Sequence, residues 1–444
     1  MWISPEAATS YRRCMTTTER PVGEIGEQFD PLNPHSMYDF YTRARAEQPV
    51  FYNPRLGFWV VTRYADIDQI ENLTGGGTVS ANGALNLIKP PCPAALKVIV
   101  ESGVKVDNSI VDEDPPDHGP KRNALRERLH GKIVQTYEPR IRELVTRKLD
   151  GIVDRGEADL VRDYVHEIPA WVIFQLMGVP EEDMEMVREY AKGNGKFGFG
   201  IPTDEEQVRD AEGIAKYWEY AKRHVDARLE LVATNSGGDD IMSHYIRRMR
   251  EFEDGRLFSV PDCYTLMLQL LFAGHETTTN SAGNAFRALL EHRDQWNAIC
   301  ADPSLIPAAV DECLRYATPV PHWRRTTLKP LTIGDVTIPA GETVMIALAS
   351  GNHDDDVFPH GDQLDIHRAN ARRHLAFGRG RHRCLGEQLA LLELKVILEE
   401  LTRRLPHIEL VPGQEWVYNP NVSHRGVEHV LVTWDPTANP PASR

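Results

Sequence analysis

The spacing of hydrophobic positions predicts a chain dominated by helices. From Lys121 to about Arg250, apolar residues recur at helical intervals among charged ones, and glycines and prolines mark the breaks. Ser259 and Asp262 have capping-box spacing and open another helical stretch that reaches about His292. At about 1.5 Å per residue, a helix of that length crosses an entire domain. We therefore expect one long central helix within a mainly α-helical fold.

Shorter elements are expected around this helix. Helical patterns occupy three further segments: 34–48, 304–317 and the residues from Cys384 to about Arg404. Alternating apolar positions indicate small β-sheets built from three segments: a hairpin at 50–63, strands within 326–349 and a strand at 427–434. Two long segments, 75–116 and 350–383, are expected to be irregular, and loops of that length in a compact domain usually carry function.

Residues 31–436 are expected to form a single domain. No internal repeat and no Ser/Gly-rich linker divides them. Residues 1–30 are predicted to be a flexible N-terminal extension, and residues 437–444 a C-terminal tail. Met15, which precedes a polar TTTERP segment, is an alternative start to Met1.

Composition and charge narrow the classes of function. The 444 residues carry 50 basic and 65 acidic side chains, a net charge of −15, which disfavours binding to nucleic-acid phosphates. Six widely separated cysteines suggest a reducing compartment rather than a disulfide framework. There is no clear secretory signal, and the best apolar run, Leu266–Gly274, is too short to span a bilayer. We expect a cytoplasmic protein that binds neither nucleic acid nor membrane.

The segment FGRGRHRCLG places Cys384 just before the last long helix and carries the clearest chemical signal. A sulfur at a helix N-terminus meets the positive end of the helix dipole, so we expect a lowered thiol pKa. Gly378, Gly380 and Gly386 remove side chains where the backbone must wrap closely around a group. The pattern suits either a nucleophilic or a metal-ligating thiolate, and a buried structural cysteine is the alternative.

This segment resembles the F-x-x-G-x-H-x-C-x-G signature of the cytochrome P450 family of haem-thiolate monooxygenases, and the resemblance extends from about Pro31 to Pro436. It implies the cytochrome P450 fold, with haem b between the long central helix and the cysteine-loop helix. In that arrangement Cys384 is the axial iron ligand and Phe377 packs beside its sulfur. The resemblance implies cofactor contacts for six further residues: His118, Arg122, Arg325, Gly378, His382 and Gly386.

Haem carries two propionates that require cationic partners. The resemblance gives this role to His118 and Arg122 in DPPDHGPKR, to Arg325 in PVPHWRRTT, and to His382. Arginine suits it because a guanidinium can bind a carboxylate bidentately. Arg324 is an alternative to Arg325.

A polar interruption marks the centre of the long helix, where residues 270–282 read LLFAGHETTTNSA. A carboxylate inside a core is costly unless it is paired, so one explanation is a kinked helix with an exposed polar face. The segment also resembles the acid–alcohol site of the family. That resemblance implies that Thr277 hydrogen-bonds the reacting oxygen and that Glu276 connects it to water. It also implies that the helix loosens at Gly274 to admit O2, and that Ala273 is small because haem lies against it.

Glu312 and Arg315 form an E-x-x-R pattern on the 304–317 helix. In isolation such a pair contributes only a few tenths of a kcal/mol, and most are surface features. Here the pattern matches the family motif that braces the cysteine loop. The family often adds an arginine from the following segment, and the matching position here is Gln363.

The sequence shows no site for a second redox cofactor, because it lacks a Walker loop, a complete GxGxxG and a CxxC cluster. We therefore expect electrons from a ferredoxin with its reductase, or from a flavin-type reductase. Five arginines near Cys384 are expected to steer that acidic partner, with at least one bound to haem or structural carboxylates: Arg372, Arg373, Arg379, Arg381 and Arg383. The C-terminal run also resembles haem domains fused to a reductase, so a free-standing enzyme and a truncated haem domain both remain open.

The resemblance implies a monomeric monooxygenase that inserts one atom of O2 into a small or medium apolar organic substrate, by hydroxylation, epoxidation or dealkylation. Five segments are expected to line the substrate pocket: 80–112, 192–202, Leu268–Ala273, Val320–Trp323 and Asn419–Val422. Lys196 and His322 are expected to be solvated or structural, and contact with a substrate carboxylate is the alternative. The alternatives are a peroxide-driven peroxygenase and a non-enzymatic haem-thiolate gas sensor or carrier.

Overall fold

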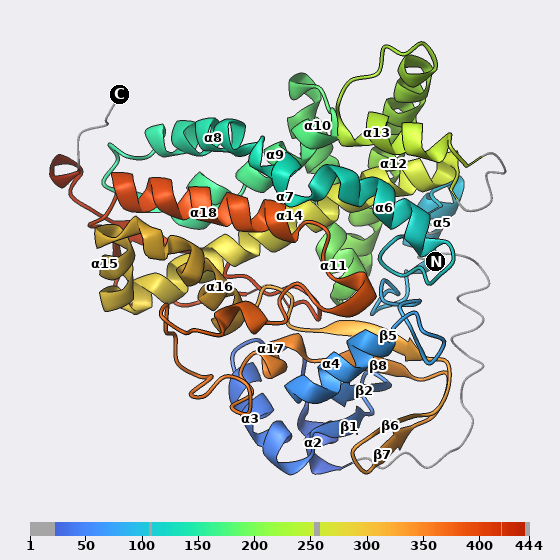
Figure 1. The fold of residues 1–444 in the computed structure, drawn as a ribbon, viewed down its shortest axis with the longest axis horizontal. Helices are drawn as coiled ribbons and strands as arrows, with labels where there is room; N and C mark the ends of the chain where they lie inside the picture. The colour runs from blue at the N-terminus through green and yellow to red at the C-terminus, as the bar shows by residue number, and fades with distance from the viewer. Residues whose placement is uncertain (1–22, 106–108, 253–257, 419, 440–444) are drawn as a thin grey trace.

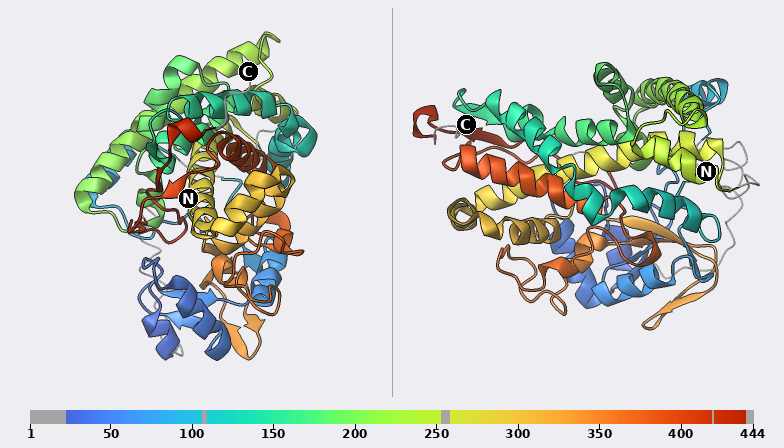
Figure 2. Two further views of the ribbon diagram at one scale, coloured as in Figure 1. Left: turned by 90° about the vertical axis from the view of Figure 1, so that its left-hand side faces the viewer. Right: turned by 45° about the horizontal axis from the view of Figure 1, so that its top comes forward.

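The computed structural model describes residues 23–105, 109–252, 258–418 and 420–439. Most helices gather in one large part of the molecule, and the largest sheet lies to one side of it together with α2, α3 and α4 (Figures 1 and 2). This arrangement confirms the predicted mainly α-helical fold with small sheets. No helix within the described ranges is long and apolar enough to cross a bilayer.

The helices are distributed along the whole described chain, with the longest separations before α5, α17 and α18. Their bounds are α2 Glu24–Gln28, α3 Met37–Glu47, α4 Tyr64–Leu73, α5 Pro93–Glu101, α6 His118–Leu129, α7 Gly131–Gln135, α8 Glu138–Asp150, α9 Ile168–Met177, α10 Glu181–Tyr190, α11 Asn194–Phe199, α12 Asp204–Ala233, α13 Ile241–Met249, α14 Val260–Glu291, α15 Arg293–Ala301, α16 Ile306–Tyr316, α17 Leu348–Gly351 and α18 Glu387–Arg404. A π-helical turn at Leu160–Val165 precedes α9, and a short 3-10 turn at Gly380–His382 precedes α18.

The strands form three small sheets. The largest has the order β1-β2-β8-β5-β3, and only its β2–β8 pair is parallel. Its strands are β1 Val50–Asn53, β2 Phe58–Val61, β3 Val79–Ser80, β5 Trp323–Thr327 and β8 Thr343–Ile346. The other strands are β4 Glu157–Asp159, β9 Glu409–Leu410 and β10 Leu431–Thr433 in one sheet, and β6 Leu331–Ile333 with β7 Val336–Ile338 in the other.

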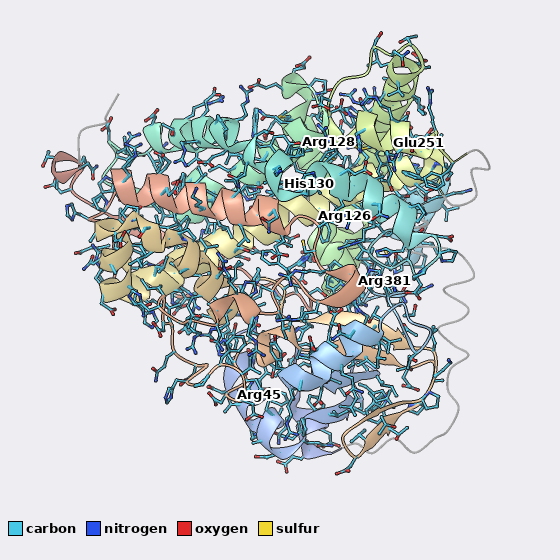
Figure 3. All side chains as sticks on the ribbon, in the orientation of Figure 1. Arg45, Arg126, Arg128, His130, Glu251 and Arg381 are labelled. Atoms are coloured by element: carbon cyan, nitrogen blue, oxygen red, sulfur yellow. The ribbon has the colours of Figure 1, made fainter. Side chains whose placement is uncertain are left out.

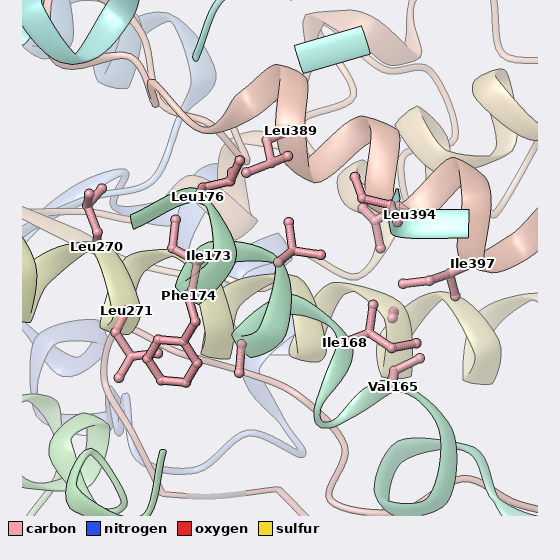
Figure 4. Close-up of a cluster of buried hydrophobic side chains, with 14 of the residues drawn as sticks. Val165, Ile168, Ile173, Phe174, Leu176, Leu270, Leu271, Leu389, Leu394 and Ile397 are labelled. Carbon is pink, nitrogen blue, oxygen red and sulfur yellow. The ribbon is translucent and has the colours of Figure 1, made fainter. Parts of the chain in front are cut away.

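Helix α14 is the predicted central helix, and its start is fixed by the predicted capping box. The backbone N–H and the hydroxyl of Ser259 both donate to the Asp262 carboxylate at 2.6 Å. Apolar side chains of α9, α14 and α18 pack against one another (Figure 4). They include Ile173, Phe174, Leu270, Leu271, Leu389 and Leu394. Their burial fixes α14 against α18, the helix that follows the cysteine loop.

Two sequence-based expectations of irregular structure are wrong. Residues 24–28 of the predicted flexible extension form α2, and Ile25 and Phe29 are buried in the core. The supposedly irregular segment 75–116 contains α5. Both helices are too short for their apolar spacing to stand out in the sequence. Residues 1–22, including Met15, lie outside the described residues.

Candidate active site

The loop that carries Cys384 is shaped by tight backbone contacts. The Cys384 N–H donates to the Phe377 carbonyl at 2.8 Å. Gly378 and Gly380 adopt left-handed conformations, with φ of +63° and +65°. A side chain on Gly380 would lie 2.5 Å from the carbonyl oxygen of Glu71, so only glycine lets the loop rest on α4. Gly386 is less constrained, because a Cβ there would lie 3.7 Å from the Cys384 sulfur, an ordinary contact.

The predicted lowering of the Cys384 pKa is wrong. Burial raises the pKa of this thiol and outweighs the backbone N–H groups of Gly386 and Glu387 and the charge of Arg122, which lower it. Helix α18 begins at Glu387 with Gly386 as its N-cap, so Cys384 lies two residues before the cap. The side chain is nevertheless accessible to solvent. These properties weigh against a helix-activated nucleophile and leave a sulfur that is open to a ligand.

His118 and His382 form the clearest feature near this loop. Their rings stack with centroids 4.2 Å apart. The Nε2 atoms of both rings are buried and have no hydrogen-bond partner among the described residues. Burial lowers the pKa of His118 to about 4 and that of His382 to about 2. Because buried polar atoms in native proteins are nearly always hydrogen-bonded, two adjacent unpartnered nitrogens indicate a site for an anionic group.

The two predicted arginines of this site differ in their surroundings. Arg122 donates to the carbonyl of Arg383, next to the cysteine. Arg325 is buried and pairs with the Glu71 carboxylate at 2.8 Å, and it also donates to Thr74 and to its neighbour's carbonyl. Those bonds use three of its five N–H groups. Glu71 is a partner that sequence reasoning missed.

Arg324 does not take the place of Arg325. Its guanidinium donates to the carbonyls of Asn86 and Ala84 at 2.6 and 2.8 Å, and it lies over the Phe199 ring. It therefore ties the 80–112 segment to β5.

The centre of α14 is open to solvent on one side. Ala273 is exposed and Phe272 and Gly274–Thr277 are partly buried, whereas α14 is buried at Leu270 and Leu271 before them and at Thr278 and Thr279 after them. The hydroxyl of Thr277 donates to the Ala273 carbonyl at 2.8 Å. A side chain on Gly274 would lie 3.0 Å from Ile173, so its small size lets α9 pack on α14. The expected loosening of the helix at Gly274 is absent, because α14 is helical throughout.

Glu276 lies on α14 between two segments that sequence reasoning did not connect with it. The His424 Nδ1 atom is 3.6 Å from its carboxylate, and Gly195 of α11 lies directly against that carboxylate. Burial would raise the pKa of Glu276, but the nearby imidazoles, His424 first and then His275 and His166, lower it overall. The neighbouring His275 points elsewhere, with its Nε2 atom 2.8 Å from the carbonyl of His166.

The E-x-x-R pair is fully buried and doubly bonded. Arg315 donates to both oxygens of Glu312, at 2.7 and 2.8 Å. The third member is Arg368, whose Nε lies 3.1 Å from Glu312, so the assignment to Gln363 is wrong. Gln363 contributes only its backbone carbonyl, which accepts from Arg315 at 2.8 Å. Arg368 lies only five residues after Gln363 in an irregular segment, where sequence spacing alone does not fix which residue reaches Glu312.

Comparisons of the sequence with known proteins identify the family of this chain. The family model for cytochrome P450 matches residues 201–415. Vitamin D(3) 25-hydroxylase of Pseudonocardia autotrophica is 34% identical over 411 residues, which cover 91% of this chain and 94% of that protein. The chain belongs to the cytochrome P450 family.

Solved structures show the same P450 fold. The haem domain of a Tepidiphilus thermophilus P450 has a TM-score of 0.88 and 37% identity, and the match covers 94% of this chain and 99% of that one. An intact type IV self-sufficient P450 monooxygenase has a TM-score of 0.90 and 41% identity, and the match covers 95% of this chain. The chain spans only 54% of that second protein.

Segments expected to line the P450 substrate pocket do converge. The Phe199 ring of α11 lies within 5.8 Å of Phe272 and Trp323, measured between centroids. The Phe199 carbonyl accepts from the Val422 N–H at 2.9 Å, and Ile88 donates to the same helix. Asn419 and residues 106–108 lie outside the described residues.

The two residues set aside as structural or solvated are both engaged within the protein. Lys196 pairs with Glu206 at 2.7 Å. His322 is buried between the Tyr41 hydroxyl and the carbonyl of Val422.

The arginines near Cys384 are partly committed to carboxylates. Arg372 pairs with Asp311 at 2.9 Å, and Arg383 with Glu387 at 2.6 Å. Arg381 is exposed on the same side of the molecule as Arg126 and His130 of the α6 region (Figure 3). The expected positive surface therefore contains fewer unpaired arginines near Cys384 than the sequence suggested. Basic residues of the α6 region lie on the same side and add to it (Figure 3).

Proposed function

We propose that this P450 is a haem-thiolate monooxygenase that inserts one atom of O2 into a small or medium apolar organic substrate. The proposal rests on two features of the same region. The Cys384 side chain is accessible, and the stacked rings of His118 and His382, whose centroids are 4.2 Å apart, each carry a buried Nε2 atom without a hydrogen-bond partner among the described residues. The sulfur is a ligand for iron, and the nitrogens suit a carboxylate of the same group.

The residues present fit haem b. Cys384 would hold the iron and His118 and His382 would hold propionate, while Arg122 and Arg325, which has two N–H groups free of the bonds described above, would add positive charge. The Phe377 ring lies against His374, with centroids 5.6 Å apart, and Gly378 and Gly386 present no side chain toward the group. Once bound, such a group supplies the oxygen-activating chemistry.

Thr277 and Glu276 would relay protons from water to this chemistry. The Thr277 hydroxyl is held by the Ala273 carbonyl at the open side of α14. Glu276 stands next to it in the chain, and its lowered pKa keeps it ionised and able to exchange protons with water. Gly274 contributes by close helix packing, and Ala273 leaves space beside the hydroxyl.

An apolar substrate is supported by the aromatic rings of Phe199, Phe272 and Trp323, which meet where these segments converge. Electrons come from an acidic ferredoxin or from a flavin-type reductase that docks on the basic face with Arg126 and Arg381. A reductase fused to the chain is a further source, because the self-sufficient neighbour is about twice as long. The protein works in the cytoplasm as a monomer.

The test uses purified haem-loaded protein, a ferredoxin with its reductase, and a panel of small aromatics, terpenes and fatty acids. Candidate substrates are first selected by a shift of the ferric spectrum from low to high spin. Monooxygenation predicts product that carries one atom of labelled oxygen when ¹⁸O2 is supplied. Product with hydrogen peroxide alone would instead identify a peroxygenase. Absence of product under both conditions, with carbon monoxide still bound, would identify a gas sensor or carrier.

A further inference from the structure

We propose that His424 is a positioning residue that holds the Glu276 carboxylate in one orientation beside Thr277 and thereby keeps electron flow coupled to product. The inference rests on the proton relay of the proposed function. It adds a residue from the C-terminal loop to that relay.

The imidazole of His424 is aimed at the carboxylate. Its Nδ1 atom lies 3.6 Å from the Glu276 Oε2 atom, within ion-pair range. The side chain is only 3% exposed, and Nδ1 is buried with no hydrogen-bond partner among the described residues, so the Glu276 carboxylate is within ion-pair range but not hydrogen-bonded. The ring is held between Phe199 of α11 and Phe272 of α14, at centroid distances of 5.2 and 5.0 Å. Because Phe272 lies one turn before Glu276 on the same helix face, the ring has little freedom to leave the carboxylate.

The loop that carries His424 is fixed by its backbone. The Asn421 side-chain oxygen accepts from the N–H groups of Ser423 and His424, both at 2.8 Å. The Asn421 amide nitrogen donates to the Gly195 carbonyl at 3.1 Å. The Arg425 N–H donates to the carbonyl of Pro319 at 2.8 Å. The imidazole therefore sits on a braced segment rather than on a free loop.

The backbone of Gly195 packs directly against the Glu276 carboxylate. A Cβ at this position would lie 2.3 Å from Oε2 and 2.8 Å from Oε1 of Glu276. No side chain fits there without moving the carboxylate, because real Cβ contacts are not that short. Glu276 is thus enclosed by glycine backbone on one side and by imidazole on the other.

The remaining groups near Glu276 leave the positioning role to His424. His275 and His166 influence its charge, and Arg188 lies beside His166, with an Nη1-to-Nε2 distance of 3.2 Å. Among the described residues, however, His424 is the side chain in ion-pair contact with the carboxylate. No described lysine or arginine takes that place.

Three variants test the proposal in haem-loaded protein. His424→Phe keeps the ring packing and removes the nitrogen, whereas His424→Gln keeps a polar contact. We expect coupling of electrons to product in His424→Phe to fall by about tenfold, part of what a proton-transferring group contributes, and to recover partly in His424→Gln. Gly195→Ala should uncouple like His424→Phe. His407→Phe, at an exposed position, is the control.

A spectroscopic measurement separates positioning from general structural damage. In the ferrous carbonyl state, ¹⁵N NMR of labelled histidines should show that Glu276→Gln shifts the ring signals of His424, while those of His407 stay unchanged. Unmoved His424 signals, with wild-type coupling in His424→Phe, would overturn the proposal. If Glu276→Gln itself leaves coupling unchanged, the proton relay of the proposed function fails instead. A His424→Phe protein that does not load haem leaves the decision to Gly195→Ala and the NMR shifts.

Discussion

At the scale of single residues, the Cys384 side chain is accessible to solvent, although the protein around it raises the pKa of its thiol. We expect Cys384→Ser to abolish the thiolate-type carbonyl spectrum of the reduced protein, because a hydroxyl does not replace a thiolate at iron. Cys300→Ser on α15 is the matched control and should keep that spectrum. Retention of the spectrum in Cys384→Ser would reject the ligand assignment.

Thr277 carries the second residue-scale prediction. Thr277→Ala removes the hydroxyl held by the Ala273 carbonyl, so electrons should be diverted from product to hydrogen peroxide. Thr279→Ala removes a hydroxyl that donates to the carbonyl of His275 on the same helix and should leave the ratio unchanged. Peroxide and product are measured together per electron consumed. Equal ratios in the two variants would argue against the relay.

Sequence patterns located the residues that belong to short motifs. Cys384, Glu276 and Thr277 belong to short contiguous motifs, so their chemical roles could be predicted without knowledge of the fold. Glu71 and His424 were missed because each meets its partner across a large sequence separation, Glu71 with Arg325 and His424 with Glu276. Nothing in the residues around His424 marks it, since its role depends entirely on which helix packs against it.

At the scale of elements, the buried Glu312–Arg315–Arg368 network joins α16 to the segment before the cysteine loop. Glu312→Gln leaves two buried guanidinium groups without their carboxylate and should lower the free energy of unfolding by about 3–5 kcal/mol. Arg368→Gln should lower it less, because the Glu312–Arg315 pair survives. Gln363→Ala should have little effect, since only the backbone of Gln363 takes part. Urea unfolding of the three variants checks this order, and a large effect of Gln363→Ala would contradict it.

Elements with strong local signals were predictable and weak ones were not. The capping box gave the start of α14 within one residue, because the cap and the apolar run lie side by side in the sequence. Helices α2 and α5 are short, and their burial depends on distant neighbours such as the β1 strand that contacts α2. Periodicity alone therefore could not separate them from loops.

At the scale of the whole molecule, buried neutral histidines make stability sensitive to acid. His322 accepts from the Tyr41 hydroxyl and donates to the Val422 carbonyl, and burial lowers its pKa from 6.5 to about 4. Between those values the unfolded chain binds a proton that the folded chain does not, so stability falls as pH falls from 6.5 to 4, by up to about 1.4 kcal/mol per pH unit. The Tm between pH 7 and 5 should drop less steeply in His322→Gln. His407→Gln should match the wild type, and a matching slope in both variants would contradict the assignment.

Surface charge supplies a second prediction at this scale. Arg126 and Arg381 are exposed on one face of a molecule with a net charge of −15 (Figure 3). Reversing both to glutamate should slow reduction by an acidic ferredoxin severalfold at low salt, and rising salt should shrink the difference because it screens exposed charges. Lys329→Glu, on the connection between β5 and β6, should change the rate little. Stopped-flow measurement at several ionic strengths compares the reduction rates of the wild type, the double variant and Lys329→Glu. A rate defect that does not depend on salt would argue against electrostatic steering.

The contact between Arg122 and the carbonyl of Arg383 joins positions 261 residues apart. The histidine pair next to it spans a similar interval, from the start of α6 to the turn before α18. During synthesis on the ribosome, the earlier half of this site therefore emerges more than 250 residues before its counterpart. The prosthetic group cannot be held by both halves until the residues through the turn before α18 have left the exit tunnel.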